Sequence, residues 1–87
     1  MQKRTKIAED EKKEIRGNLT YMLENALELY GEEDPKRAID EGYGIVRGFY
    51  NALLIAYTTD AVDAEMYDEI CNIWEVYRLR VRKVCKV

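Results

Sequence analysis

The spacing of apolar residues predicts a first amphipathic helix over residues 8–30. Between Ile15 and Tyr30, apolar side chains recur every three or four residues, and most glutamates of the segment fall outside that stripe. Gly17 lowers the helix propensity, so the alternative is a helix that is broken near Gly17. Gly31 follows directly, and glycine commonly ends a helix. The segment therefore has both the apolar face and the end signal of a packed helix.

A second helix is predicted over residues 35–58. Asp34 can cap its start, and Pro35 suits the first helical position because that position needs no N–H donor. Two neighbouring stripes repeat every seven residues: Ile39, Val46 and Leu53, and Tyr43, Tyr50 and Tyr57. Residues 48–59 carry no charge, so we expect this helix to be buried on nearly all sides, at the centre of a bundle or under a second subunit. The alternative is a break near Gly42.

The third predicted helix covers residues 64–85. Asp63 stands where it can cap the start, and Val62 and Tyr67 have the spacing of a hydrophobic staple around such a cap. From Tyr67 to Val84, apolar residues recur in steps of three and four without a break. Acidic residues occupy the first turns and basic residues the last, which is the distribution that the helix dipole favours.

Together these patterns predict an all-α fold, a three-helix up-down-up bundle that forms a single domain over residues 1–87. A chain of 87 residues is long enough for one hydrophobic core and short for two domains. We expect residues 1–7, which precede the first apolar stripe, to be flexible.

The sequence indicates neither a membrane protein nor a secreted one. Residues 1–12 lack the apolar core of a secretory signal, and residues 42–59 fall short of the roughly 20 apolar residues that cross a bilayer. Cys71 and Cys85 on one helix would be separated by about 21 Å, too far for a disulfide. We therefore expect a cytoplasmic protein with reduced, buried cysteines and no membrane partner.

The composition removes the most common kinds of catalytic and metal site. The chain has no histidine and no serine, so it lacks the usual general base, the usual neutral metal ligand and the usual hydroxyl nucleophile. Two cysteines alone cannot close a tetrahedral zinc shell, and no glycine motif of a phosphate-binding loop is present. We expect that the chain is not an enzyme and binds no cofactor, metal or small-molecule ligand.

The excess of aromatic and aliphatic residues on the second and third helices has two interpretations. The residues serve as simple core, or they form an interface with a second copy of the chain or with another protein. The candidate interface residues are Tyr50, Leu54, Ile55, Tyr57 and Trp74. On the second interpretation, the chain is a small protein-interaction or accessory module that self-associates as a dimer through these two helices.

A second candidate surface is the basic end of the third helix. Its residues are Arg78, Arg80, Arg82, Lys83 and Lys86. They complement the helix dipole at a solvated helix end, or they contact phosphates, which gives the alternative function of a nucleic-acid-associated regulator. The net charge of −3 disfavours general nucleic-acid binding. In an up-down-up bundle, the acidic residues 32–34 would also lie beside this basic end and partly neutralise it.

Overall fold

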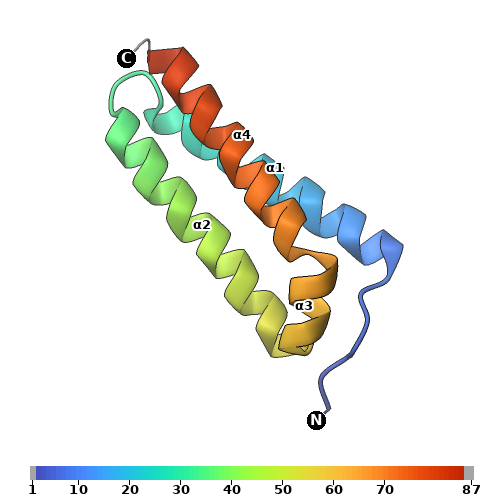
Figure 1. Cartoon of the computed structure of the whole chain (residues 1–87). Helices are drawn as coiled ribbons and strands as arrows, with labels where there is room; N and C mark the ends of the chain where they lie inside the picture. Colours follow the sequence, from blue (N-terminus) through green and yellow to red (C-terminus); the bar gives the residue numbers. More distant parts are fainter. Residues whose placement is uncertain (1, 86–87) are drawn as a thin grey trace.

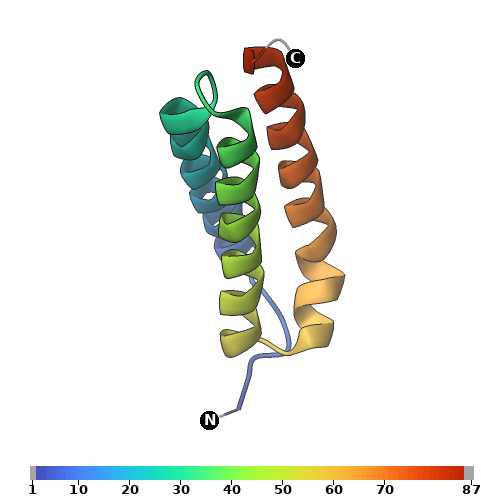
Figure 2. The same ribbon diagram turned by 90° about the vertical axis from the view of Figure 1, so that its left-hand side faces the viewer.

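The computed structural model describes residues 2–85 and shows four helices packed around one core (Figure 1). The helices are α1 (Glu9–Tyr30), α2 (Pro35–Ala56), α3 (Thr59–Glu65) and α4 (Tyr67–Cys85). The three long helices alternate in direction, and the short α3 occupies the turn between α2 and α4 (Figures 1 and 2). The all-α prediction is confirmed, but the predicted count of three helices is wrong, because the structure has four.

The additional helix arises because the chain becomes helical again earlier than predicted. The cap is Thr58 and not Asp63: the Thr58 hydroxyl oxygen accepts a hydrogen bond from the Ala61 N–H at 3.3 Å. Val62 therefore lies inside α3 and is fully buried, so it cannot act as the predicted staple residue before a cap.

The break between α3 and α4 falls at a buried residue. Met66 leaves the helical conformation, with φ of −129° and ψ of −22°, and its side chain is packed in the core. The helix then resumes at Tyr67. The periodicity of residues 64–85 does not reveal this break, because Met66 is apolar and continues the stripe.

Both long helices that contain glycines run without interruption. α1 is continuous through Gly17 and α2 through Gly42, so neither alternative break occurs. Gly42 instead allows α4 to approach α2 closely. A Cβ atom at this position would lie 2.5 Å from Cε2 of Tyr77 and 3.1 Å from Cζ3 of Trp74.

The N-terminal segment is attached to the bundle and differs from the flexible segment expected for residues 1–7. The Arg4 N–H donates to the Ala56 carbonyl at 3.0 Å, and the Thr58 N–H donates to the Arg4 carbonyl at 2.9 Å. The Ile7 side chain is only 1% exposed. Both views show the segment at the end of the bundle where α2 meets α3 (Figures 1 and 2). Residues 4–7 thus close that end of the core.

Tyr77 links α4 to α2 through a buried hydrogen bond. Its hydroxyl donates to the Ala38 carbonyl oxygen at 2.7 Å, and burial raises the pKa of the Tyr77 phenol above its ordinary value. Because the folded chain holds this proton more tightly than the unfolded chain, Tyr77 stabilises the fold fully below its unfolded pKa. That contribution is lost as the pH rises through the raised value.

Replacing Tyr77 with phenylalanine is therefore expected to lower the free energy of unfolding at pH 7 by about 1–2 kcal/mol, the effect of losing one buried hydrogen bond. It is also expected to flatten the decline in stability at alkaline pH, because phenylalanine has no hydroxyl proton that could dissociate. Urea titrations between pH 7 and pH 11 measure both effects. Equal alkaline slopes for the two proteins would contradict this assignment.

Candidate protein-interaction surfaces

An aromatic groove runs between α2 and α4, with a volume of about 560 Å³. Tyr43 and Trp74 have ring centroids 5.9 Å apart, and Tyr50 and Tyr67 meet edge to face at 6.1 Å. Each pair joins a ring from α2 to a ring from α4, and Ile70 lies among the residues lining the groove. Four aromatic side chains thus form an accessible surface on one side of the bundle.

Polar groups lie along the margin of this groove and hold some of its rings in place. The Tyr50 hydroxyl donates to an Asp63 carboxylate oxygen at 2.7 Å, and this hydrogen bond raises the pKa of Tyr50. The Arg47 guanidinium lies 5.8 Å from the centre of the Tyr43 ring, a cation–π distance. The groove therefore combines apolar contact area with groups that can orient a partner.

The structure separates the five predicted interface residues. Tyr50 and Trp74 lie half-buried in the groove, and Leu54 is half-buried on α2. Ile55 is 79% exposed, whereas Tyr57 is only 2% exposed. Tyr57 is thus a core residue and not an interface residue, because the backbone turns extended at this position.

Tyr57 is covered by the N-terminal segment. The Arg4 guanidinium lies 4.5 Å from the centre of its ring, and its hydroxyl donates to a Glu11 carboxylate oxygen. Burial, and then this hydrogen bond, raise the pKa of the Tyr57 phenol.

The outward face of α2 is unusually open. A Cβ atom added at Gly44 or Gly48 would meet no atom of residues 2–85 within 4 Å apart from its own stretch of helix. A shallow groove of about 580 Å³ runs along these glycines toward Met22 of α1. Unlike Gly42, neither glycine is required by packing within the chain.

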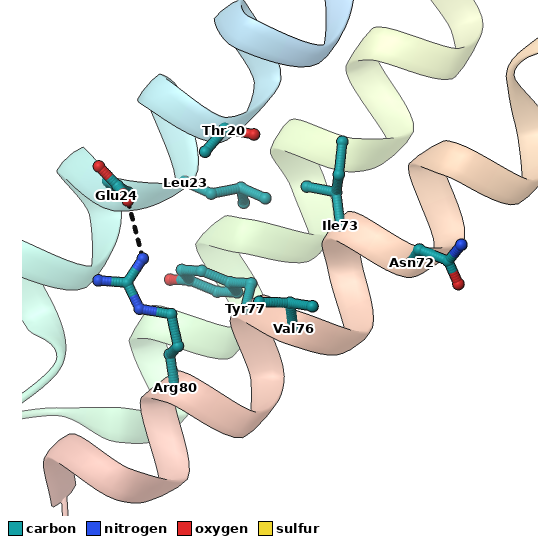
Figure 3. A pocket seen from close by; sticks show the side chains of 8 residues that line it. All are labelled: Thr20, Leu23, Glu24, Asn72, Ile73, Val76, Tyr77 and Arg80. Atoms are coloured by element: carbon teal, nitrogen blue, oxygen red, sulfur yellow. Dashed lines mark hydrogen bonds and ion pairs between the residues drawn. The ribbon is translucent and has the colours of Figure 1, made fainter.

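A smaller pocket of about 200 Å³ lies between α1 and α4, and sequence reasoning missed it (Figure 3). Leu23 contributes from α1, and Ile73, Val76 and Tyr77 contribute from α4. At one end, Arg80 donates to a Glu24 carboxylate oxygen at 2.8 Å. No periodic pattern could reveal the pocket, because it depends on how two helices far apart in the sequence diverge.

Ion pairs connect α1 to α3 and α4 along this side of the bundle. Lys12 pairs with Glu65, and Arg16 pairs with Glu69 at 2.8 Å. Hydrogen bonding to Glu65 raises the pKa of Lys12, and the same contact lowers the pKa of Glu65. Glu24 and Arg80 pair at one end of the pocket, and these two pairs lie beyond its other end.

The predicted basic patch is partly neutralised. Arg78 pairs with Glu75 at 3.1 Å and Arg80 with Glu24. Arg82 and Lys83 are exposed and have no ion-pair partner among residues 2–85, whereas Lys86 lies outside the described residues. The neutralising carboxylates come from α1 and α4, and not from residues 32–34 as expected.

Other chemistry is sparse in the described part of the chain. Cys71 is an exposed free thiol at the aromatic groove, so the expectation that it is buried is wrong; the side chain of Cys85 lies outside the described residues. Within residues 2–85, no three carboxylate or thiol side chains gather as a metal site would require. No helix in that range is long and apolar enough to cross a membrane.

Comparison with known proteins identifies no relative of this chain. No protein-family model, curated protein or solved structure matches it. A function must therefore be inferred from the geometry of these surfaces.

Proposed function

We propose that this chain is a small protein-interaction module that pairs with a second copy of itself through α2 and the adjoining aromatic groove. The observation that carries the proposal is the open face of α2 beside four accessible aromatic rings. We propose no catalytic role, because the surfaces offer apolar contact and paired charges and do not assemble a nucleophile with a base.

The two open glycines support close packing by another helix. A glycine inside a helix costs roughly 0.5–1 kcal/mol relative to alanine, and Gly44 and Gly48 recover none of this through contacts within the chain. Glycines four residues apart lie on the same side of a helix and allow a second backbone to come close. Ile55 is 79% exposed further along the same side of α2 and extends the apolar surface that is open to a partner.

Charge complementarity favours a second copy as that partner. Asp40 and Arg47 are seven residues apart, so they lie about 10 Å apart on the same side of α2, with Gly44 between them. If two α2 helices run antiparallel about a two-fold axis near Gly44, Asp40 of each copy comes opposite Arg47 of the other. The same surface of each copy thereby supplies both the negative and the positive partner of each charge pair, as a two-fold dimer requires.

A charge-swap experiment tests this arrangement by light scattering during size exclusion. The wild type is expected to elute as a dimer of about twice 10.2 kDa. Asp40→Arg and Arg47→Asp each create two like-charge contacts, so each is expected to weaken dimerisation about tenfold, equivalent to about 1.4 kcal/mol. The double variant is expected to restore the dimer. Glu14→Arg, on the exposed side of α1, is the matched control.

Two outcomes would refute the proposal. One is a wild type that stays monomeric at millimolar concentration. The other is a double variant that associates no better than the single variants, which would place the interface elsewhere.

The alternative function, a nucleic-acid regulator, is less well supported, because two of its predicted arginines are already paired with carboxylates.

A further inference from the structure

We infer that the pocket between α1 and α4 receives one neutral aromatic side chain from a partner protein. This inference concerns a second site, because the pocket shares no residue with the aromatic groove or with the α2 face. A dimer formed through α2 would leave it free, and its test does not depend on whether that dimer forms.

The size of the pocket restricts its occupant. Drug-sized ligands and cofactors occupy clefts of roughly 300–1,000 Å³, whereas an apolar cavity of about 150 Å³ holds benzene. At about 200 Å³, this pocket accepts a single ring and excludes a nucleotide or a flavin. The lining side chains of Leu23, Ile73 and Val76 offer that ring apolar contacts (Figure 3).

The charges around the pocket favour a neutral group. Glu24 and Arg80 pair with each other at one end, and Arg16 and Glu69 pair one or two turns away toward the other. Each pair is neutral, so an ionised ligand in the apolar centre would lose its hydration without gaining a free counter-charge. A phenyl or indole ring carries no such penalty.

The surroundings favour a polypeptide over a free small molecule. Val76 at the pocket and Leu79 nearby are each 58% exposed, and their spacing of three residues places them on the same side of α4. A free ring would fill the pocket but leave Leu79 in water. A partner segment that carries the ring can cover both, as happens where an anchor residue enters a pocket within an interface.

Titration of the full-length ¹⁵N-labelled chain with indole and with N-acetyl-tryptophanamide tests the inference by NMR. Both probes are expected to shift the amides of Leu23, Ile73 and Val76, with dissociation constants of about 1 mM. N-acetyl-tryptophanamide carries the ring on a peptide-like backbone, so it is expected to bind at least as tightly as indole.

A variant in which a larger side chain fills the pocket is compared with a variant changed elsewhere on α1. Thr20 is exposed at the pocket, and Thr20→Phe is expected to weaken binding of both probes at least tenfold. Asn25→Phe, an exposed position elsewhere on α1, is expected to change it less than twofold. Val76→Phe is the second filling variant if Thr20→Phe does not fold.

Three results would overturn the inference. The first is no shift along α1 and α4 at 10 mM probe. The second is binding that Thr20→Phe and Val76→Phe leave unchanged. The third is binding of indole without binding of N-acetyl-tryptophanamide, which would assign the pocket to free small molecules. Light scattering on the same samples reports self-association separately.

Discussion

Replacing Ile7 with alanine is expected to lower the free energy of unfolding by about 2–5 kcal/mol, the range for truncating a buried isoleucine. The side chain is 1% exposed although it lies before the first helix, and it packs in the same core cluster as Tyr57 and Val62. Removing three carbons there leaves a cavity at the end of the bundle. Urea denaturation followed by circular dichroism measures the loss.

The neighbouring Lys6→Ala is the control for Ile7→Ala, because Lys6 is exposed and its truncation removes no core contact. Its free energy of unfolding is expected to stay within about 0.5 kcal/mol of the wild type. A loss of similar size in both variants would mean that the effect does not come from burial of the Ile7 side chain. A loss in neither would mean that this side chain is not packed in the core in solution.

Gly42→Ala is expected to destabilise the fold by about 1–3 kcal/mol, although alanine is the better helix former. The added Cβ would stand 2.5 Å from Cε2 of Tyr77. That ring cannot easily move aside, because it is 3% exposed, stacks on Trp74 at 5.8 Å and holds the hydrogen bond to Ala38. Thermal and urea unfolding both measure this loss.

Gly17→Ala is the matched substitution with the opposite expected sign. A Cβ at Gly17 meets nothing within 4 Å, so only helix propensity changes, and stability is expected to rise by up to about 1 kcal/mol. If both alanine variants are stabilised, α4 does not approach α2 as closely as the structure indicates.

Periodicity predicted the long helices well, because each packs one continuous apolar face. The first was predicted over residues 8–30 and is observed as Glu9–Tyr30, and the Asp34 cap of α2 is confirmed by its hydrogen bond from the Arg37 N–H at 3.1 Å. Periodicity failed where it continued past the end of a helix. Tyr57 follows Tyr50 by seven residues, but α2 has ended by then.

The candidate surfaces were only partly predictable for the same reason. Tyr50 and Trp74, which aromatic spacing placed in the candidate interface, both line the groove between α2 and α4. The spacing gave no sign of Ile7, which stands in a largely charged segment, or of the pocket between α1 and α4. Those features depend on how the elements meet in three dimensions, and no local pattern encodes that.

The ion pairs that join α1 to α3 and α4 also favour one direction of α4 relative to α1. Along α1 the charges run from basic Lys12 and Arg16 to acidic Glu24, and the partners on α3 and α4 run in the opposite order of sign, from Glu65 and Glu69 to Arg80. Reversing α4 would bring arginine toward arginine and glutamate toward glutamate. Partly exposed pairs of this kind add little stability, but their order disfavours a bundle in which α4 runs in the opposite direction.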